Sequence, residues 1–287
     1  MAPEIEAFLH KPTSTWSYVV ADPDAGDAAV IDPVMDFDAA SGGTAFTAAD
    51  EIVAHLRERR LSLRWILETH AHADHLTAAA YLRDALGGRI AIGAGICRVQ
   101  QTFKRLLNLG NDFAIDGSQF DRLLTDGERL AVGNLSVEII ATPGHTSDGL
   151  SYLIGDALFV GDTLFMPDVG TARCDFPGGD AATLYDSIRR LLSLPDETRM
   201  FMLHDYPPSG REIACETTVG AQRAHNIHVR DGVNREEFVA LRKRRDATLP
   251  VPKLLYPALQ INLRGGRLPP PEANGVAYLK LPLKTDL

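Results

Sequence analysis

The first half of the chain alternates between segments with the period of a strand and segments with the period of a helix. Residues 17–22 and 28–32, joined by a turn rich in Asp, Pro and Gly, predict a hairpin. Apolar residues at helical spacing predict a helix over 47–60, with acidic residues early and arginines late. A strand over 63–68, a helix over 77–86 and a strand over 89–93 follow. Strands alternating with helices indicate a layered α/β fold.

The second half returns to the strand pattern after a weaker stretch, because residues 100–133 are mostly polar and predict little regular structure. Strands are expected over 136–140 and 151–154, in a β-rich run that ends at 158–162, and near 200–204, with an amphipathic helix over 181–192. From Pro250 onward Pro and Gly are dense and no long helical period is present. We therefore predict one large domain over residues 1–250 and an extension over 251–287 packed on it.

Composition and charge narrow the class of protein. The net charge is −9, and basic residues gather only at 242–245, which predicts the solvated end of a helix and no nucleic-acid surface. No apolar run reaches the ~18 residues that a membrane span needs, and the start at Met1 is acidic, unlike a targeting peptide. We expect a cytoplasmic protein without a membrane partner. Among three separated cysteines, Cys97 and Cys215 are expected to be packed, and Cys174 to be packed or reactive.

The segment His70-Ala-His72-Ala-Asp74-His75 places four metal-binding side chains in six residues, directly after a predicted strand. Imidazole and carboxylate together suit zinc, iron or manganese, and the lack of a thiolate argues against a closed structural zinc site. Alternating residues of an extended loop point the same way, so His70, His72 and Asp74 can converge, and His75 is expected to begin the next helix. The segment predicts a catalytic metal site, with a surface loop rich in His and acid as the alternative.

Three further candidate ligands follow other predicted strands. His145 comes after Thr142-Pro-Gly, Asp162 comes after Gly161, and His204 precedes Asp205-Tyr206. A single histidine in such a place would more often be packed or on the surface. Loops at one edge of a rigid sheet are, however, where catalytic residues collect. Together with the first segment, these residues predict one common site.

In order and spacing, these motifs resemble the five-part signature of the metallo-β-lactamase superfamily. The resemblance implies an αββα sandwich, two mixed β-sheets flanked by helices, with the metal site at one edge. The segments 69–75, 170–176 and 204–206, and several after residue 216, resemble the persulfide dioxygenases of the ethylmalonic-encephalopathy type. The likeness extends over nearly the whole chain. It departs at Cys174, where the family often has Thr, and at 41–46, which looks like an insertion found in some bacterial members.

The resemblance also implies how the ligands divide. One Fe(II) per chain would be held by His70, His145 and Asp162, a facial triad that leaves positions for substrate and O2. The other four candidates would form an outer shell or hold a second metal, with zinc as an alternative occupant, and they are His72, Asp74, His75 and His204.

For the substrate glutathione persulfide, the resemblance points to three residues. Arg173 would pair with a carboxylate of glutathione, Asp175 would accept a hydrogen bond from its amine, and Tyr206 would donate to its backbone. A local salt bridge is the alternative for Arg173 and Asp175, and packing is the alternative for Tyr206.

The activity implied by the resemblance is oxidation of glutathione persulfide with O2 to sulfite and glutathione. A homodimer and a rhodanese-type partner enzyme are expected with it. One alternative is a glyoxalase II-like hydrolase with two metal ions that cleaves glutathione thioesters, against which the short Pro-rich tail argues. A second alternative is a non-catalytic redox or sulfide sensor, against which the intact ligand set argues. A nuclease or a true β-lactamase fits less well, because the chain has no basic groove and neither activity accounts for a glutathione-type loop.

Overall fold

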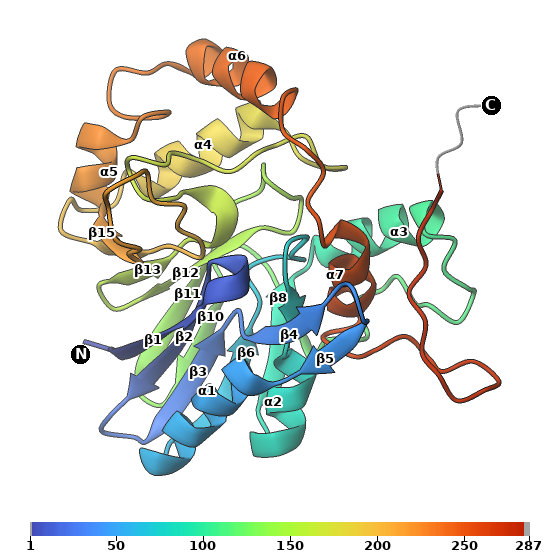
Figure 1. Ribbon diagram of the computed structural model, residues 1–287. Coiled ribbons are helices and arrows are strands. Elements are labelled where there is room, and N and C mark those ends of the chain that lie inside the picture. Colours follow the sequence, from blue (N-terminus) through green and yellow to red (C-terminus); the bar gives the residue numbers. More distant parts are fainter. Residues whose placement is uncertain (1, 284–287) are drawn as a thin grey trace.

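Two β-sheets lie face to face, and helices cover the outer face of each sheet (Figure 1). The computed structural model describes residues 2–283. Met1 and residues 284–287, the two ends of the predicted domain and extension, lie outside the described residues. The four layers are the αββα sandwich expected from the sequence.

The first sheet holds six strands in the spatial order β1 (Glu4–His10), β2 (Thr15–Asp22), β3 (Asp27–Ile31), β6 (Ser62–Leu67), β8 (Arg89–Gly93) and β9 (Arg122–Leu124). Strands β1 to β3 are antiparallel, whereas β3, β6, β8 and β9 are parallel. In β2, Val19 faces the helices and Tyr18 faces the second sheet. Burial of both faces explains the nearly continuous apolar strands.

The second sheet has the order β10 (Arg129–Val132), β11 (Leu135–Ala141), β12 (Leu150–Ile154), β13 (Ala157–Phe159), β14 (Arg199–Phe201) and β15 (Glu216–Thr218). Only β13 and β14 pair in parallel within it. A small third sheet consists of β5 (Gly43–Ala45), β4 (Val34–Asp38) and β7 (Leu76–Thr77). The segment 41–46, which looked like an insertion, thus contributes the edge strand β5.

Three helices pack on the first sheet, and they are α1 (Thr47–Glu58), α2 (Ala79–Leu86) and α3 (Ile96–Leu106). Three others pack on the second sheet, and they are α4 (Ala181–Leu191), α5 (Val219–His225) and α6 (Arg235–Asp246). Helix α7 (Leu255–Asn262) adds Leu259 and Ile261 to the apolar core between the first sheet and its helices. Two 3-10 turns, η1 (Lys11–Thr13) and η2 (Gly161–Thr163), complete the regular structure described. No described helix is long and apolar enough to cross a membrane.

Several expectations about elements are confirmed and others are wrong. The hairpin and the helices over 47–60 and 181–192 are present. Helix α3 was missed, because Val99 and Phe103 give it a narrow apolar face among polar residues. His75 does not begin a helix, since the next two residues pair with β4 before α2 begins at Ala79. The tail contains helix α7, although no long helical period was apparent in it.

The basic segment and the cysteines also differ in part from expectation. Helix α6 ends at Asp246, so residues 242–245 form its last turn as predicted, but Arg242 is buried and not solvated. Cys97 and Cys215 are partly buried and pack against apolar clusters. Cys174 is buried, and burial raises the pKa of its thiol to about 12. A thiol with such a pKa stays protonated near neutral pH, which favours packing over reactivity for Cys174.

Candidate metal centre

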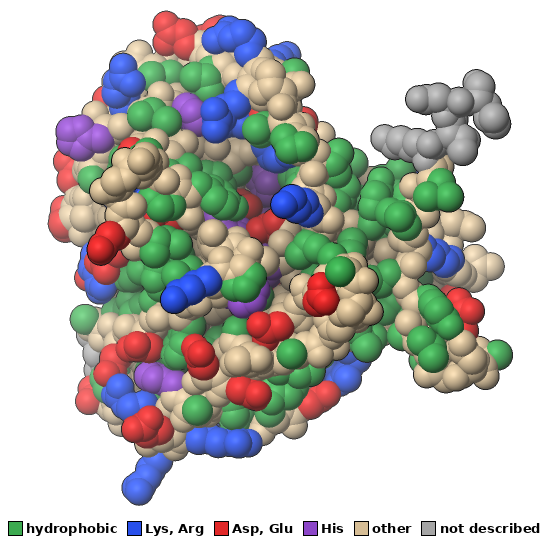
Figure 2. Space-filling model, viewed as in Figure 1, with side chains coloured by type: hydrophobic (Ala, Val, Ile, Leu, Met, Phe, Trp, Pro, Cys, Tyr) green, Lys and Arg blue, Asp and Glu red, His purple; other side chains and the backbone are tan. Residues whose placement is uncertain are grey.

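Histidine and aspartate side chains converge where strands end, at one edge of the two sheets. They come from loops or turns after β6, β11, β13 and β14, and they are His70, His72, Asp74, His75, His145, Asp162 and His204. Figure 2 shows histidine and acidic side chains in a hollow of this face. The sequence-predicted residues therefore lie together, while which of them bind a metal stays a prediction.

His70, His145 and Asp162 form one group whose ligand atoms all lie within 4.8 Å of one another. Asp162 Oδ2 is 3.9 Å from His70 Nε2 and 3.6 Å from His145 Nε2. His70 Nε2 is buried without a hydrogen-bond partner among the residues described, and so is the other carboxylate oxygen, Asp162 Oδ1, which lies 3.5 Å from His204 Nε2. Burial lowers the pKa of His70 well below its usual range and raises the pKa of Asp162. Buried polar atoms without partners, arranged around one point, fit a bound metal ion.

Hydrogen bonds at the other ring nitrogens fix the orientation of both histidines. Thr69 Oγ1 donates to Asp32 Oδ2 at 2.8 Å, so at 3.1 Å it can only accept from His70 Nδ1. His145 Nδ1 donates to the backbone carbonyl of Arg173 at 2.7 Å. In both rings the proton therefore lies on Nδ1, and the lone pair lies on Nε2 beside Asp162. Two imidazole lone pairs and one carboxylate are the donors that a 2-His-1-carboxylate iron site uses.

His72 is turned toward a pair of buried carboxylates. Its Nε2 lies 2.9 Å from Asp32 Oδ1 and 3.2 Å from Glu68 Oε2, and its Nδ1 has no partner among the residues described. Burial opposes a charged imidazole, but the two carboxylates raise the pKa of His72 well above its usual range. His72 groups with Asp74 and His75, and His70 groups elsewhere. The expectation that His70, His72 and Asp74 point to one place is wrong, because the loop after β6 is irregular and not an extended strand.

Asp74, His75 and His204 line the other side of the site. His204 Nε2 is 2.9 Å from Asp74 Oδ2 and 3.5 Å from Asp162 Oδ1. Although these two atoms are close, the geometry between them is not that of a hydrogen bond. Asp74 Oδ2 and His204 Nε2 are therefore both buried without a hydrogen-bond partner among the residues described. Burial lowers the pKa of His204, but the nearby carboxylates of Asp74 and Asp162 outweigh burial and raise it to about 9. Once His204 loses its proton, these atoms could serve as donors to a second metal ion, and their role as ligands stays a prediction.

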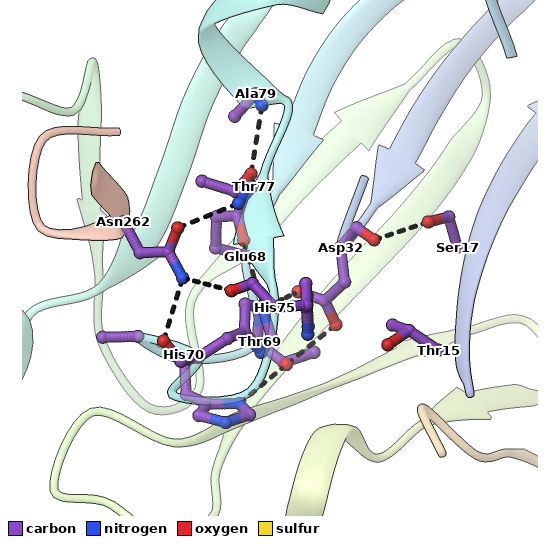
Figure 3. A network of polar contacts seen from close by, with 12 residues as sticks. Thr15, Ser17, Asp32, Glu68, Thr69, His70, His75, Thr77, Ala79 and Asn262 are labelled. Carbon is purple, nitrogen blue, oxygen red and sulfur yellow. Dashed lines mark hydrogen bonds and ion pairs between the residues drawn. The ribbon is translucent and has the colours of Figure 1, made fainter. Parts of the chain in front are cut away.

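The side chain of Asn262, on α7, forms hydrogen bonds to the segment after β6 that carries His70 to His75 and ends at Thr77, which we call the metal loop (Figure 3). Its Oδ1 accepts from the backbone N–H of Thr77 at 2.8 Å. Its Nδ2 donates to the backbone carbonyls of His72 at 2.9 Å and of His75 at 2.8 Å. Because Asn262 is buried, these three bonds hold the loop backbone between two candidate ligands.

A cavity of about 500 Å³ opens over the metal group. The candidate ligands Asp74, His145 and Asp162 line it, together with the aromatic rings of Phe165, Phe176 and Tyr206. Tyr206 stacks on the ring of His204 at an interplanar angle of 17°, and half of its surface is exposed. Its contacts fit the packing role, and its role toward substrate stays a prediction.

Arg173 and Asp175 form the local salt bridge that was the alternative for them. Arg173 Nε and Nη2 contact the two carboxylate oxygens of Asp175 at 2.6 and 2.7 Å, and its Nη1 donates to the carbonyl of Pro250 at 2.7 Å. Each donor nitrogen of the guanidinium thus already has a partner. Contact with glutathione stays a prediction for these residues, and their observed contacts weaken it.

Two side chains of helix α6 form hydrogen bonds to the backbone of the loop that contains Arg173. Arg242 donates to Asp246 and, at 3.1 Å, to the carbonyl of Thr171, while Asp246 Oδ2 accepts from the backbone N–H of Cys174 at 2.9 Å. Because Arg242 and Asp246 are both buried, removal of either side chain would leave an unpaired buried charge at this wall of the cavity.

Sequence reasoning missed the residues that support the candidate ligands. Glu68 is next to the metal-binding segment, and a carboxylate at the end of an apolar strand was a signal for it. Asp32 ends another apolar strand in the same way. Asn262 gave no signal, because a single asparagine in the tail matches no pattern of its own. Arg242 was hidden inside a basic segment typical of a solvated helix end.

A profile of the Metallo-beta-lactamase superfamily matches residues 10–204, which is more than half of the chain. The chain belongs to the metallo-beta-lactamase superfamily. A protein of Burkholderia pseudomallei called "Probable metallo-hydrolase" is 52% identical over 97% of this chain and 98% of its own length. "Glyoxylase B2" of Dictyostelium discoideum is 47% identical over 98% of this chain and 97% of its own length.

Proteins called persulfide dioxygenases are more distant in sequence. The mitochondrial "Persulfide dioxygenase ETHE1" of Mus musculus is 30% identical over 94% of this chain and 92% of its own length. The crystal structure of ETHE1 from Myxococcus xanthus matches with a TM-score of 0.73 and 32% identity, covering 92% of this chain and 100% of that chain. Relatives named as hydrolases and relatives named as dioxygenases thus both resemble this chain over nearly its whole length.

Proposed function

We propose that this protein is a persulfide dioxygenase with one iron per chain, which oxidises glutathione persulfide with O2 to sulfite and glutathione. The observation that carries the proposal is the group of His70, His145 and Asp162, of which His145 and Asp162 line the cavity. His72 groups with other residues, so this position offers two histidines and a carboxylate, unlike the three-histidine set of many catalytic zinc sites. The similarity to the mouse persulfide dioxygenase and to ETHE1 of Myxococcus xanthus supports it.

The proposed reaction balances with glutathione persulfide, O2 and water as its only reactants. Both atoms of O2 join the terminal sulfur of the persulfide, and O2 is reduced as that sulfur is oxidised. Water then adds to the oxidised sulfur, the S–S bond breaks, and the inner sulfur takes a proton and leaves as glutathione. Glutathione persulfide, O2 and water thus give glutathione and sulfite. Fe(II), when bound, would supply the redox chemistry with O2 and open positions that bring the two reactants together.

The side chains around the site would hold the donors and exclude water. The carbonyl of Arg173 and the hydroxyl of Thr69 keep the two Nε2 lone pairs directed at Asp162. The rings of Phe165 and Phe176 line the cavity above the group and limit the access of bulk water to it. Homodimer formation, a rhodanese-type partner and a cytoplasmic location stay predictions from the sequence.

Hydrolysis of a glutathione thioester by two metal ions is the second candidate function. One structural observation favours it, because His72 Nδ1, His75 Nε2 and His204 Nε2 are buried without hydrogen-bond partners in the part of the chain described. The names of two relatives also support this candidate, since the protein of Burkholderia pseudomallei is called a metallo-hydrolase and that of Dictyostelium discoideum is called Glyoxylase B2.

Replacing His75 with alanine separates the two candidates, because His75 belongs only to the second set of donors. If one iron is bound at the first group, we expect His75→Ala to keep one iron per chain, as the wild type does. O2 uptake should fall by no more than about a hundredfold, the usual range for a supporting residue. Elemental analysis of both folded proteins is the measurement. Two metal ions per chain in the wild type and one in the variant would contradict the proposal.

A further inference from the structure

Three arginines line the cavity, and two of them are already paired. Arg173 is held by Asp175, and Arg242 is held by Asp246. Arg245 has no salt bridge or side-chain hydrogen bond within residues 2–283. A cation in a substrate cavity that has no anionic partner is suited to bind an anionic group of the substrate.

The acidic residues of the cavity do not offer that partner. Asp74 and Asp162 belong to groups of candidate metal ligands, and Asp168 is paired with Arg211 at 2.6 Å. The cavity therefore has carboxylates at the metal group and an unpaired arginine on its α6 wall. A ligand with a sulfur to place at the metal group and a carboxylate elsewhere would match both ends.

The position of Arg245 on α6 directs it to the same wall as Arg242. The two residues are three apart in the helix, so they lie on one face of it. Arg242 is buried and held by its ion pair with Asp246, whereas Arg245 is exposed and no salt bridge within residues 2–283 holds its side chain. Both charges lower the pKa of His228, to about 4, with burial as the larger cause. His228 therefore stays neutral near pH 7 and does not compete with them for an anion.

We infer that Arg245 binds a carboxylate of the glutathione part of the substrate. This inference rests on a glutathione-derived substrate, as in the proposed function, and it replaces Arg173 as the best candidate for that contact. The ligand class is a glutathione thiol derivative whose sulfur points to the metal group. Arg245 is thus a substrate-binding residue that sets affinity and leaves the chemistry at sulfur unchanged.

The test uses S-methylglutathione, a thioether that cannot form a persulfide, titrated calorimetrically into the holoprotein. We expect Arg245→Gln to weaken its binding by about tenfold or more, the effect of losing a charge-assisted hydrogen bond. Arg244→Gln is the matched control, because Arg244 is an exposed neighbour on the same helix that does not line the cavity. It should bind S-methylglutathione within about twofold of the wild type, the scale expected for a surface change.

Two amides of the ligand identify the carboxylate. The glycine amide and the γ-glutamyl α-amide of S-methylglutathione each lack one carboxylate. The amide that lacks the carboxylate bound by Arg245 should bind the wild type more weakly than S-methylglutathione does. Arg245→Gln should bind that amide and S-methylglutathione equally well. Equal binding of S-methylglutathione by wild type and Arg245→Gln would overturn the inference, as would no binding by the wild type. Binding that depends on Arg245, without persulfide-dependent O2 uptake, would support this subsite and reject the dioxygenase.

Discussion

Asp162→Asn is expected to lose its iron and to reduce persulfide-dependent O2 uptake by about a thousandfold. Asp162 supplies the only carboxylate of the group with His70 and His145. The asparagine has the same shape but no charge, so it binds a cation weakly. A metal ion contributes several kcal/mol to such reactions, and about 4 kcal/mol corresponds to a thousandfold in rate.

The matched control for this prediction is Asp168→Asn. Asp168 also lines the cavity, but it pairs with Arg211 and lies outside the metal groups. We expect it to keep one iron per chain and an O2 uptake within about threefold of the wild type, as for a partly exposed ion pair. Iron content and initial O2 uptake of the three proteins are the measurements. An Asp162→Asn protein that keeps its iron and its rate would show that the metal is held elsewhere.

Asn262→Ala is expected to destabilise the protein and to weaken iron binding together. The substitution leaves the N–H of Thr77 and the carbonyls of His72 and His75 buried without their partner. An unsatisfied buried group costs about 1–3 kcal/mol, so we expect the free energy of unfolding to fall by roughly 3 kcal/mol or more. The carbonyls belong to candidate ligands on the metal loop, so iron affinity should fall by about 10- to 100-fold.

Gln260→Ala provides the comparison on the same helix. Gln260 is also buried and hydrogen-bonded, but its partners are Tyr256 and Lys280, away from the metal loop. We expect Gln260→Ala to be destabilised while its iron affinity stays that of the wild type. Urea unfolding and competition with an iron chelator measure the two quantities. If both variants lose stability and neither loses iron affinity, Asn262 has only a structural role.

The sequence predicted the candidate ligands better than it predicted what they contact. His145, Asp162 and His204 each follow a strand, and strand ends of one sheet edge must be near each other whatever the details of packing. The direction of His72 could not be predicted, because it depends on Asp32, forty residues earlier in the chain. The contact between Asn262 and the metal loop spans 190 residues, and no local pattern carries such a distance.

The sequence also could not show which charged side chains have partners. We expected Arg173 to bind a substrate carboxylate, because its loop resembles that of the persulfide dioxygenases and a guanidinium can form two charge-assisted hydrogen bonds, yet Asp175 and Pro250 occupy its donors. The sequence predicted Arg245 to lie at a solvated helix end, and only the tertiary structure shows that it also lines the cavity without an ion-pair partner in the described part of the chain. Periodicity identifies helices such as α1 and α4, whereas the pairing of side chains is decided by tertiary structure.

The central claim is tested most directly by measuring metal content and O2 uptake on one preparation purified without air. We predict one iron per chain, little zinc, and one O2 consumed for each sulfite formed when glutathione persulfide is added. The same preparation should not cleave S-lactoylglutathione, a thioester of glutathione. Thioester cleavage by a protein that contains two metal ions and takes up no O2 with the persulfide would contradict the claim.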